Sequence, residues 1–232
     1  MNLAYKDIQY SLARRPRKTA SIYIERDGQI SVQVPQQFTD GEVEHLIEKK
    51  RYWIYKNLAE WKDLNATKVV REFVNGEGFP YLGRSYRLKI VDEQDEPLVL
   101  KQGYFCLRSM SDASPKTEFR EAFKNFYRER GRDRIVKRVE YFQPKMGVTV
   151  GEIRIMELQN RWASCTSDGN LNFHWKCMMA PTTVIDYIIV HELAHLTYLN
   201  HTDAFWNEVD KVMPDYRERQ DWLRQNGAGM DL

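Results

Sequence analysis

Val190–Leu196 is a short segment whose residue types suit metal chemistry. It reads Val-His-Glu-Leu-Ala-His-Leu, so His191 and His195 stand four positions apart, and Glu192 directly follows the first of them. Each residue of an α-helix turns by about 100°, so side chains four positions apart lie on one face, one turn from each other. Two imidazoles in this arrangement can bind one cation, and Glu192 beside them can take a proton from a water that the cation activates.

The helix predicted around this segment is apolar nearly all round, which is typical of a buried helix. Its apolar residues are Val184, Ile185, Tyr187, Ile188, Ile189, Val190, Leu193, Ala194 and Leu196. Two histidines and a glutamate are costly to bury in such a helix unless their polar groups are satisfied. One metal ion would satisfy them together. The alternative is a pair of core histidines that bond to backbone or carboxylate groups.

His201 is the candidate for a third metal ligand. It lies six residues after His195, so the helix has to end before His201 can reach the same cation. Asn200 tolerates the left-handed conformation that ends helices, and Thr202 can cap a further helix that starts near Asp203. Three protein ligands leave a fourth position for water, as in catalytic zinc sites, although histidines also accept nickel, cobalt or iron. The alternative is a surface histidine in a loop.

A hydrolase also needs a group that stabilises the developing oxyanion. Arg161, Tyr198, Tyr216 and Arg219 are candidates for substrate binding in this role, and no spacing decides among them. The two tyrosines could instead be aromatic rings that pack near the site. Arg161 opens a strand that is expected to border the cleft, and an edge strand there could pair with an extended peptide.

The remaining histidines and the cysteines are expected outside the metal site. His174 is expected to face solvent rather than to line the cleft, and His45 lies near glutamates on a solvated helix face. The three cysteines, Cys106, Cys165 and Cys177, are too widely spaced for a disulfide framework. We expect reduced thiols, with Cys165 and Cys177 buried as structural side chains.

The bulk composition indicates a globular protein with its own core. Of 232 residues, 42% are hydrophobic and 29% are charged, and the formal net charge is only +2. This balance argues against attraction of the whole protein to nucleic acid, although a local basic patch remains compatible with it. The N-terminus lacks the apolar stretch of a signal peptide, and no apolar run is long enough to cross a bilayer. The expectation is a cytoplasmic protein without a membrane partner.

The periodicity and turn signals predict an α+β fold without an internal repeat. The first expected elements are a hairpin at 18–34 around Asp27–Gly28, a long helix after the capping box of Thr39 and Glu42, and strands within 69–107. A second long helix is expected after Ser114, with Pro115 at its first position and a bend at Gly131. A hairpin within 148–176 and helices near 181–200, 203–213 and 215–225 would follow. Residues 1–110 would form a β-rich N-terminal region of antiparallel strands with one long helix. Residues 111–232 would form a helix-rich, zincin-like catalytic region with a hairpin edge strand beside the metal helix, and the two regions would make one compact unit.

Several further motifs accompany the His-Glu-x-x-His segment. They are Arg14-Arg15-Pro16-Arg17-Lys18-Thr19, Tyr81-Leu82-Gly83 followed by Tyr86-Arg87-Leu88, Arg161-Trp162-Ala163-Ser164-Cys165, Asn200-His201-Thr202 with Phe205-Trp206, and Pro214-Asp215-Tyr216. On these motifs, residues 14–226 resemble the YgjP-like metal-dependent hydrolases, a family placed among zinc metallopeptidase-like proteins. The resemblance implies that the three histidines bind the metal and that Glu192 is the catalytic base. Ala163 departs from the family pattern, which has glycine there, and would narrow the cleft if that glycine admits a substrate backbone.

These observations predict a zinc-dependent hydrolase of the metallopeptidase type. The metal would acidify a water, and Glu192 would take its proton as the water attacks a peptide carbonyl. Two alternatives stay open. A nucleotide hydrolase would attack phosphorus instead, and the basic run at 14–18 could serve it, but no P-loop pattern is present. A nucleic-acid-associated protein could use the basic stretch at 124–138, although charged helix faces are more often simply solvated.

A structural zinc site is the third alternative. Closed structural sites usually have four protein ligands, rich in cysteine, and only three ligands are evident here. Glu192 would also have no purpose in such a site. The substrate, the metal used in the cell, the oxyanion stabiliser and the oligomeric state do not follow from the sequence.

Overall fold

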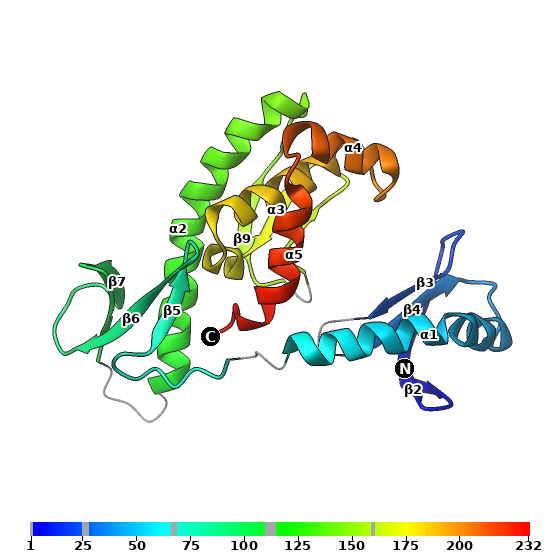
Figure 1. The fold of residues 1–232 in the computed structure, drawn as a ribbon, viewed down its shortest axis with the longest axis horizontal. Coiled ribbons are helices and arrows are strands. Elements are labelled where there is room, and N and C mark those ends of the chain that lie inside the picture. The colour runs from blue at the N-terminus through cyan, green and yellow to red at the C-terminus, as the bar shows by residue number, and fades with distance from the viewer. Residues whose placement is uncertain (1, 25–27, 66–68, 110–114, 159–160) are drawn as a thin grey trace. The chain divides into compact units, whose positions relative to one another are not determined.

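The structure is a computed structural model that describes residues 2–24, 28–65, 69–109, 115–158 and 161–232 (Figure 1). The expected α+β class is confirmed, with strands in the N-terminal part and helices toward the C-terminus. The chain divides into two compact units, Met1–Lys68 and Val69–Leu232. The sequence-based division at 110 differs from this one, because the sheet within 78–108 shares a hydrophobic core with the helices that follow it.

The first unit is a four-stranded sheet with one helix. Its strands are β1 (Asn2–Tyr5), β2 (Ile8–Arg15), β3 (Ser21–Ile24) and β4 (Ile30–Pro35), in the order β1-β2-β4-β3. The predicted antiparallel pairing of β3 with β4 is confirmed, while Asp27 of the predicted turn lies outside the described residues. The capping box is also confirmed, because the Thr39 N–H donates to the Glu42 carboxylate at 2.8 Å where α1 (Asp40–Asn65) begins.

The second unit begins with another four-stranded sheet and a long helix. Its strands are β5 (Gly78–Tyr81), β6 (Arg84–Val91), β7 (Leu98–Lys101) and β8 (Tyr104–Arg108), followed by α2 (Pro115–Met146). α2 begins at Pro115 as expected, and Ser114 before it lies outside the described residues. α2 runs without interruption through Gly131, where a bend was expected. The missing side chain makes room there for Met178, whose Cγ would lie 3.1 Å from an added Cβ.

The two four-stranded sheets share one topology, which the sequence analysis did not detect. The order β5-β6-β8-β7 matches β1-β2-β4-β3. Each sheet has antiparallel outer pairs around a parallel central pair, and each precedes a long helix. The sequence trace of this repeat is slight and lies in the first two strands: Tyr5, Tyr10 and Leu12 correspond to Tyr81, Tyr86 and Leu88. Parallel central pairs also mean that the β-rich part is mixed rather than purely antiparallel.

A third, smaller sheet leads into the C-terminal helices. Its strands are β9 (Ile153–Met156), β10 (Ala163–Cys165) and β11 (Leu171–His174), in the order β10-β11-β9, and β11 pairs with β9 in parallel. The elements that follow are the short helix η1 (Trp175–Met179), α3 (Thr182–Ala194), α4 (Asp203–Val212), α5 (Tyr216–Asn226) and η2 (Gly227–Gly229). β10 is an edge strand that contacts α3, which confirms the expected edge strand beside the helix of His191.

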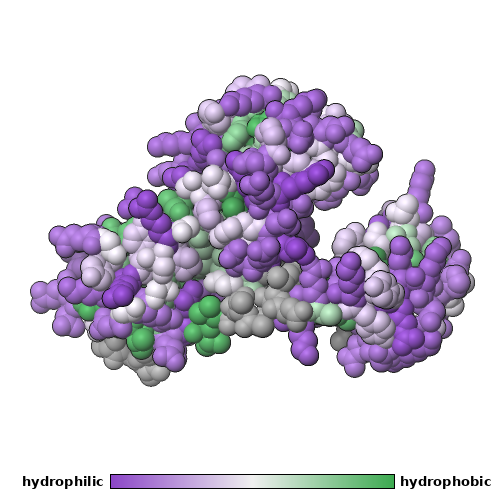
Figure 2. All heavy atoms as spheres, in the orientation of Figure 1, coloured by the Kyte–Doolittle hydropathy of each residue, from purple (hydrophilic) through white to green (hydrophobic). Residues whose placement is uncertain are grey.

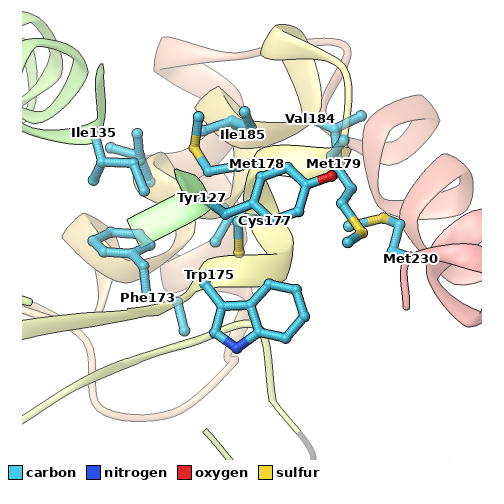
Figure 3. Close-up of a cluster of buried hydrophobic side chains, with 14 of the residues drawn as sticks. Tyr127, Ile135, Phe173, Trp175, Cys177, Met178, Met179, Val184, Ile185 and Met230 are labelled. Carbon is cyan, nitrogen blue, oxygen red and sulfur yellow. The ribbon is translucent and has the colours of Figure 1, made fainter. Parts of the chain in front are cut away.

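The core of the second unit lies where α2, η1 and α3 meet. Figure 3 shows its centre, in which Tyr127 of α2, Trp175 of η1 and Val184 of α3 belong to one cluster. The Tyr127 and Trp175 rings stack with centroids 5.9 Å apart. At the rim of this core, the Arg138 guanidinium donates to both carboxylate oxygens of Asp186 at 2.7 Å, which ties α2 to α3.

The surface is mostly polar on the face drawn in Figure 2, with small scattered hydrophobic areas. Two of the most exposed apolar residues are Val70 and Leu199, at 82% and 84% exposure. Among the described residues, no helix is long and apolar enough to span a membrane.

Candidate metal centre

The histidine-bearing helix α3 ends earlier than expected. It stops at Ala194, not near Asn200, and His195 follows at its C-terminal cap with right-handed helical φ and ψ. The Leu196 N–H donates to the Leu193 carbonyl at 3.1 Å, so the chain tightens into a turn and leaves the helix at once. Asn200 is not among the described non-glycine residues with positive φ, so the left-handed helix end predicted there is wrong.

The chain then returns His201 to the two histidines of α3. One ring nitrogen from each of His191, His195 and His201 lies within 4.8 Å of the others, so the three could hold one metal ion. His191 Nε2 and His201 Nε2 are 3.0 Å apart. Thr202 occupies the N-cap position of α4 as expected, but its side chain makes no capping hydrogen bond. The position of α4, rather than that cap, brings His201 to the cluster.

Hydrogen bonding fixes which nitrogen of His195 faces the cluster. Its Nδ1 lies 3.0 Å from the backbone carbonyl of Tyr198. A carbonyl oxygen only accepts, so Nδ1 carries the proton and Nε2 keeps a free lone pair, the form that ligates metals. Tyr198 thus contributes its backbone carbonyl, whereas the sequence analysis considered only its side chain.

The histidine cluster suits a cation better than protons. Burial lowers the pKa of His191 to about 3, with further lowering by His195 and His201. Burial likewise lowers the pKa of His201. His191 Nδ1 is buried without a hydrogen-bond partner among the described residues. Neutral imidazoles are the metal-binding form, and two Nε2 atoms 3.0 Å apart repel each other unless a proton or a cation lies between them. The three residues therefore fit a divalent transition metal.

Glu192 directly follows His191 and is a buried carboxyl group with a strongly raised pKa. Glu192 is only 6% exposed, and burial raises the pKa of its carboxyl group to about 7. The positive charge of Arg161 and the backbone N–H of Cys165 lower this pKa, but by less than burial raises it. A carboxyl group with a pKa near neutrality can both accept and return a proton at physiological pH. Cys165 belongs to the edge strand β10, so the Glu192 carboxyl faces that edge.

The other candidates for substrate binding have different environments. Arg161 is exposed just before β10. Tyr216 is 5% exposed and stacks on Trp206, with ring centroids 5.2 Å apart. Arg219 donates to the Asp215 carboxylate at 2.6 Å and to the Thr183 carbonyl at 3.2 Å. Of these, Arg161 is the cation nearest in sequence to the edge strand that borders Glu192.

Two expectations about residues near the site require correction. His174 does not face solvent: it is 6% exposed, and its Nδ1 accepts a hydrogen bond from the Lys176 N–H at 3.1 Å. It therefore caps η1 from inside the fold. Cys177 is buried as expected, but Cys165 is only partly buried. His45 is exposed on α1, as predicted.

The basic stretch at 124–138 is partly neutralised. Lys124 lies 3.1 Å from Glu157, Arg128 lies 3.9 Å from the same carboxylate, and Arg138 binds Asp186. These three cations therefore face acidic groups of the same fold, which weakens the alternative of a nucleic-acid-binding surface.

Phe205 is a residue of the site that the sequence analysis noted only as part of a motif. It is fully buried, and its ring centroid lies 5.0 Å from His191 and 4.7 Å from both His195 and His201. Phe205 lies four residues after His201, and this spacing could have indicated a role. A helix that begins between the two residues, as α4 does, turns the Phe205 side chain back toward His201.

A buried carboxylate beside three converging imidazoles, two of them on one helix, is an arrangement that metal-dependent hydrolases use. The match to a family model agrees with this class. Residues 18–226 match the family model described as YgjP-like, metallopeptidase domain. The chain belongs to the YgjP-like family, as its motifs suggested, and this membership supports a metal-dependent hydrolase.

A search of solved structures and a search of curated proteins complete the comparison. The chain is similar to the crystal structure of the metallopeptidase zymogen of Pyrococcus abyssi abylysin, with a TM-score of 0.39 and 24% identity over 42% of this chain and 99% of that one. No curated protein matches the sequence.

Proposed function

We propose that this protein is a zinc-dependent metallopeptidase, with His191, His195 and His201 as the metal ligands and Glu192 as the general base. The observation that carries the proposal is the convergence of the three imidazoles within 4.8 Å beside a buried carboxylate whose pKa is near neutrality. A bound zinc would supply Lewis acidity toward the scissile carbonyl and toward water. His201 is exposed, so solvent and a substrate can reach this side of the cluster.

Glu192 carries the proton through the reaction. In its charged form it takes a proton from the attacking water, and in its neutral form it returns that proton to the leaving amine. Burial keeps its pKa near 7, so both forms are accessible at neutral pH. Arg161 contributes positive charge on the same side and stabilises the charged form of Glu192, and we assign it to the substrate carbonyl whose oxygen becomes negative.

The edge strand β10 is the binding surface for an extended peptide. His174 N–H donates to the Trp162 carbonyl, and Thr166 N–H donates to the Asn170 carbonyl, so these alternate positions face β11. In an antiparallel pair the intervening residues, Ala163 and Cys165, direct their backbone groups away from β11, and on that side the Cys165 N–H also acts on the Glu192 carboxyl. A peptide that adds there as a further strand would run beside Glu192. This geometry favours a peptide over a nucleotide as substrate.

The experiment compares hydrolysis of casein and a fluorogenic peptide library with hydrolysis of nucleoside triphosphates. Wild type is measured beside Glu192→Gln and beside Glu129→Gln, the same substitution on the exposed face of α2. We expect peptide cleavage by wild type and by the control, and a loss of about hundredfold or more in Glu192→Gln with its metal retained. Full activity in Glu192→Gln would remove the base from the mechanism, and triphosphate hydrolysis without peptide cleavage would replace the substrate class.

A further inference from the structure

His201 differs from the other two ligands in what holds it. His191 and His195 are fixed by the last turn of α3 and its C-terminal cap, whereas His201 lies in the non-helical stretch before α4 and is exposed. The nearest backbone hydrogen bond there joins the Thr202 N–H to the Asn200 carbonyl at 2.8 Å. An exposed side chain on such a segment has several rotamers open to it, and ordering it for metal binding costs free energy. Some other contact has to select its ring orientation.

A stack of aromatic rings provides that contact. The His201 ring lies parallel to the Trp206 indole, with centroids 5.6 Å apart and an interplanar angle of 22°. The indole in turn stacks on Tyr216, with centroids 5.2 Å apart and an angle of 13°. Both spacings are within the range of favourable ring pairs. Phe205 presents its ring to His201 from a second direction, at 4.7 Å and 83°.

The far end of the stack is anchored in the fold. Tyr216 is 5% exposed at the start of α5, and its hydroxyl accepts from Arg217 Nε at 3.1 Å. The backbone of Trp206 is fixed in α4, where its backbone N–H donates to the Thr202 carbonyl at 3.1 Å. The orientation of His201 is therefore set by two helices that carry no other candidate ligand among the described residues.

We infer that Trp206 is a positioning residue for metal binding: stacked between Tyr216 and His201, it holds the third imidazole in the orientation in which its Nε2 meets those of His191 and His195. This inference rests on the proposed three-histidine site. It goes beyond that site because it assigns part of the affinity for the metal to Trp206, which is not itself a ligand. Residues that orient ligands typically contribute about 10- to 100-fold to metal affinity. Phe205 contacts all three imidazole rings, so its loss would be less selective.

The test measures Zn²⁺ affinity by competition with a chromophoric chelator in the full chain. We expect Trp206→Leu to weaken Zn²⁺ binding by about tenfold or more, and Trp206→Phe, which keeps a stacking ring, to stay within about threefold of wild type. Trp222→Leu is the matched control, because Trp222 is a partly buried tryptophan of α5 that packs on the same core. It should bind Zn²⁺ as wild type does.

A second readout separates orientation from general stability. In the Co²⁺-loaded protein, the visible absorption reports the ligand geometry, and Trp206→Leu should shift it away from the wild-type spectrum, which Trp222→Leu should keep. Unchanged Zn²⁺ affinity and an unchanged Co²⁺ spectrum in Trp206→Leu would overturn the inference. If Trp206→Leu fails to fold, Tyr216→Leu decides, with weaker binding expected than in Trp222→Leu and equal binding refuting the inference. Failure of wild type to bind Zn²⁺ would instead refute the proposed function itself.

Discussion

Replacing His174 with asparagine should remove a large part of the sensitivity of folding to acid. His174 is buried, and its Nδ1 accepts from the Lys176 N–H, so the folded state requires a neutral ring. Burial, with a further contribution from Lys176, lowers its pKa from 6.5 to about 4. The unfolded chain therefore binds this proton more readily than the folded chain. The stability that the neutral ring supports is complete above pH 6.5 and is lost as the pH falls from 6.5 toward 4.

The magnitude follows from these two pKa values. Between pH 7 and pH 5, the free energy of unfolding of the wild type should fall by about 2 kcal/mol through this residue alone. Asparagine keeps an oxygen acceptor at the cap of η1 but does not titrate. The free energy of unfolding of both proteins is measured by urea unfolding at pH 7 and pH 5, with a chelator present at each pH. The difference between the two pH dependences isolates His174, because the other ionisable groups are the same in both proteins. Equal losses in wild type and His174→Asn, within about 0.5 kcal/mol, would refute the assignment.

Two further substitutions, Gly83→Ala with its control Gly103→Ala and Asp186→Asn, test the contacts that position α3. Gly83 has φ +78°, and an added Cβ would lie 2.8 Å from Cα of Pro181 at the start of α3, whereas Gly103 has φ +81° with nothing within 4 Å. Thermal unfolding should therefore show a loss of about 1 kcal/mol for Gly103→Ala and a clearly larger loss for Gly83→Ala, and equal losses would contradict the close approach. Asp186→Asn breaks the paired hydrogen bonds from Arg138, whose side chain is 31% exposed. We expect a loss of about 1 to 2 kcal/mol in urea unfolding, and no loss would mean that solvent screens the pair.

The parts of the site that the sequence predicted are those that depend on local geometry. The spacing of His191 and His195 on a helix specifies one face without knowledge of the rest of the fold, and the structure places the two rings together. The need for the helix to end before His201 was also a local argument. It predicted the return of the chain, although Asn200 is not the residue that ends the helix.

The parts that the sequence did not predict depend on contacts between distant segments. The burial of His174 follows from the packing of β11 and η1, and a strand residue gives no signal of it. The parallel pairing of β2 with β4 joins strands that are not consecutive, so alternation along each strand could not reveal it. Tyr216 was a candidate for substrate binding, with aromatic packing near the site as the alternative, and its partner in the stack, Trp206, did not follow from the sequence.

The structure gives a physical reason for the Tyr81-Leu82-Gly83 motif, which in the sequence is only part of a family resemblance. Leu82 and Gly83 both have positive φ and form the turn between β5 and β6. Their N–H groups donate to the carbonyls of Met178 and Met179, at 2.8 Å and 3.3 Å. The turn therefore braces the segment that leads into α3, which links a motif far away in the sequence to the helix that carries the histidines.

The metal content of protein purified without added metal tests the central claim most directly. Mass spectrometry should find about one zinc per chain in wild type and in Glu192→Gln, and almost none in His201→Ala, because three protein ligands hold a catalytic zinc. Zinc retained in full by His201→Ala would show that the third ligand is another residue. A wild type that neither contains nor binds a divalent transition metal would contradict the three-histidine centre itself.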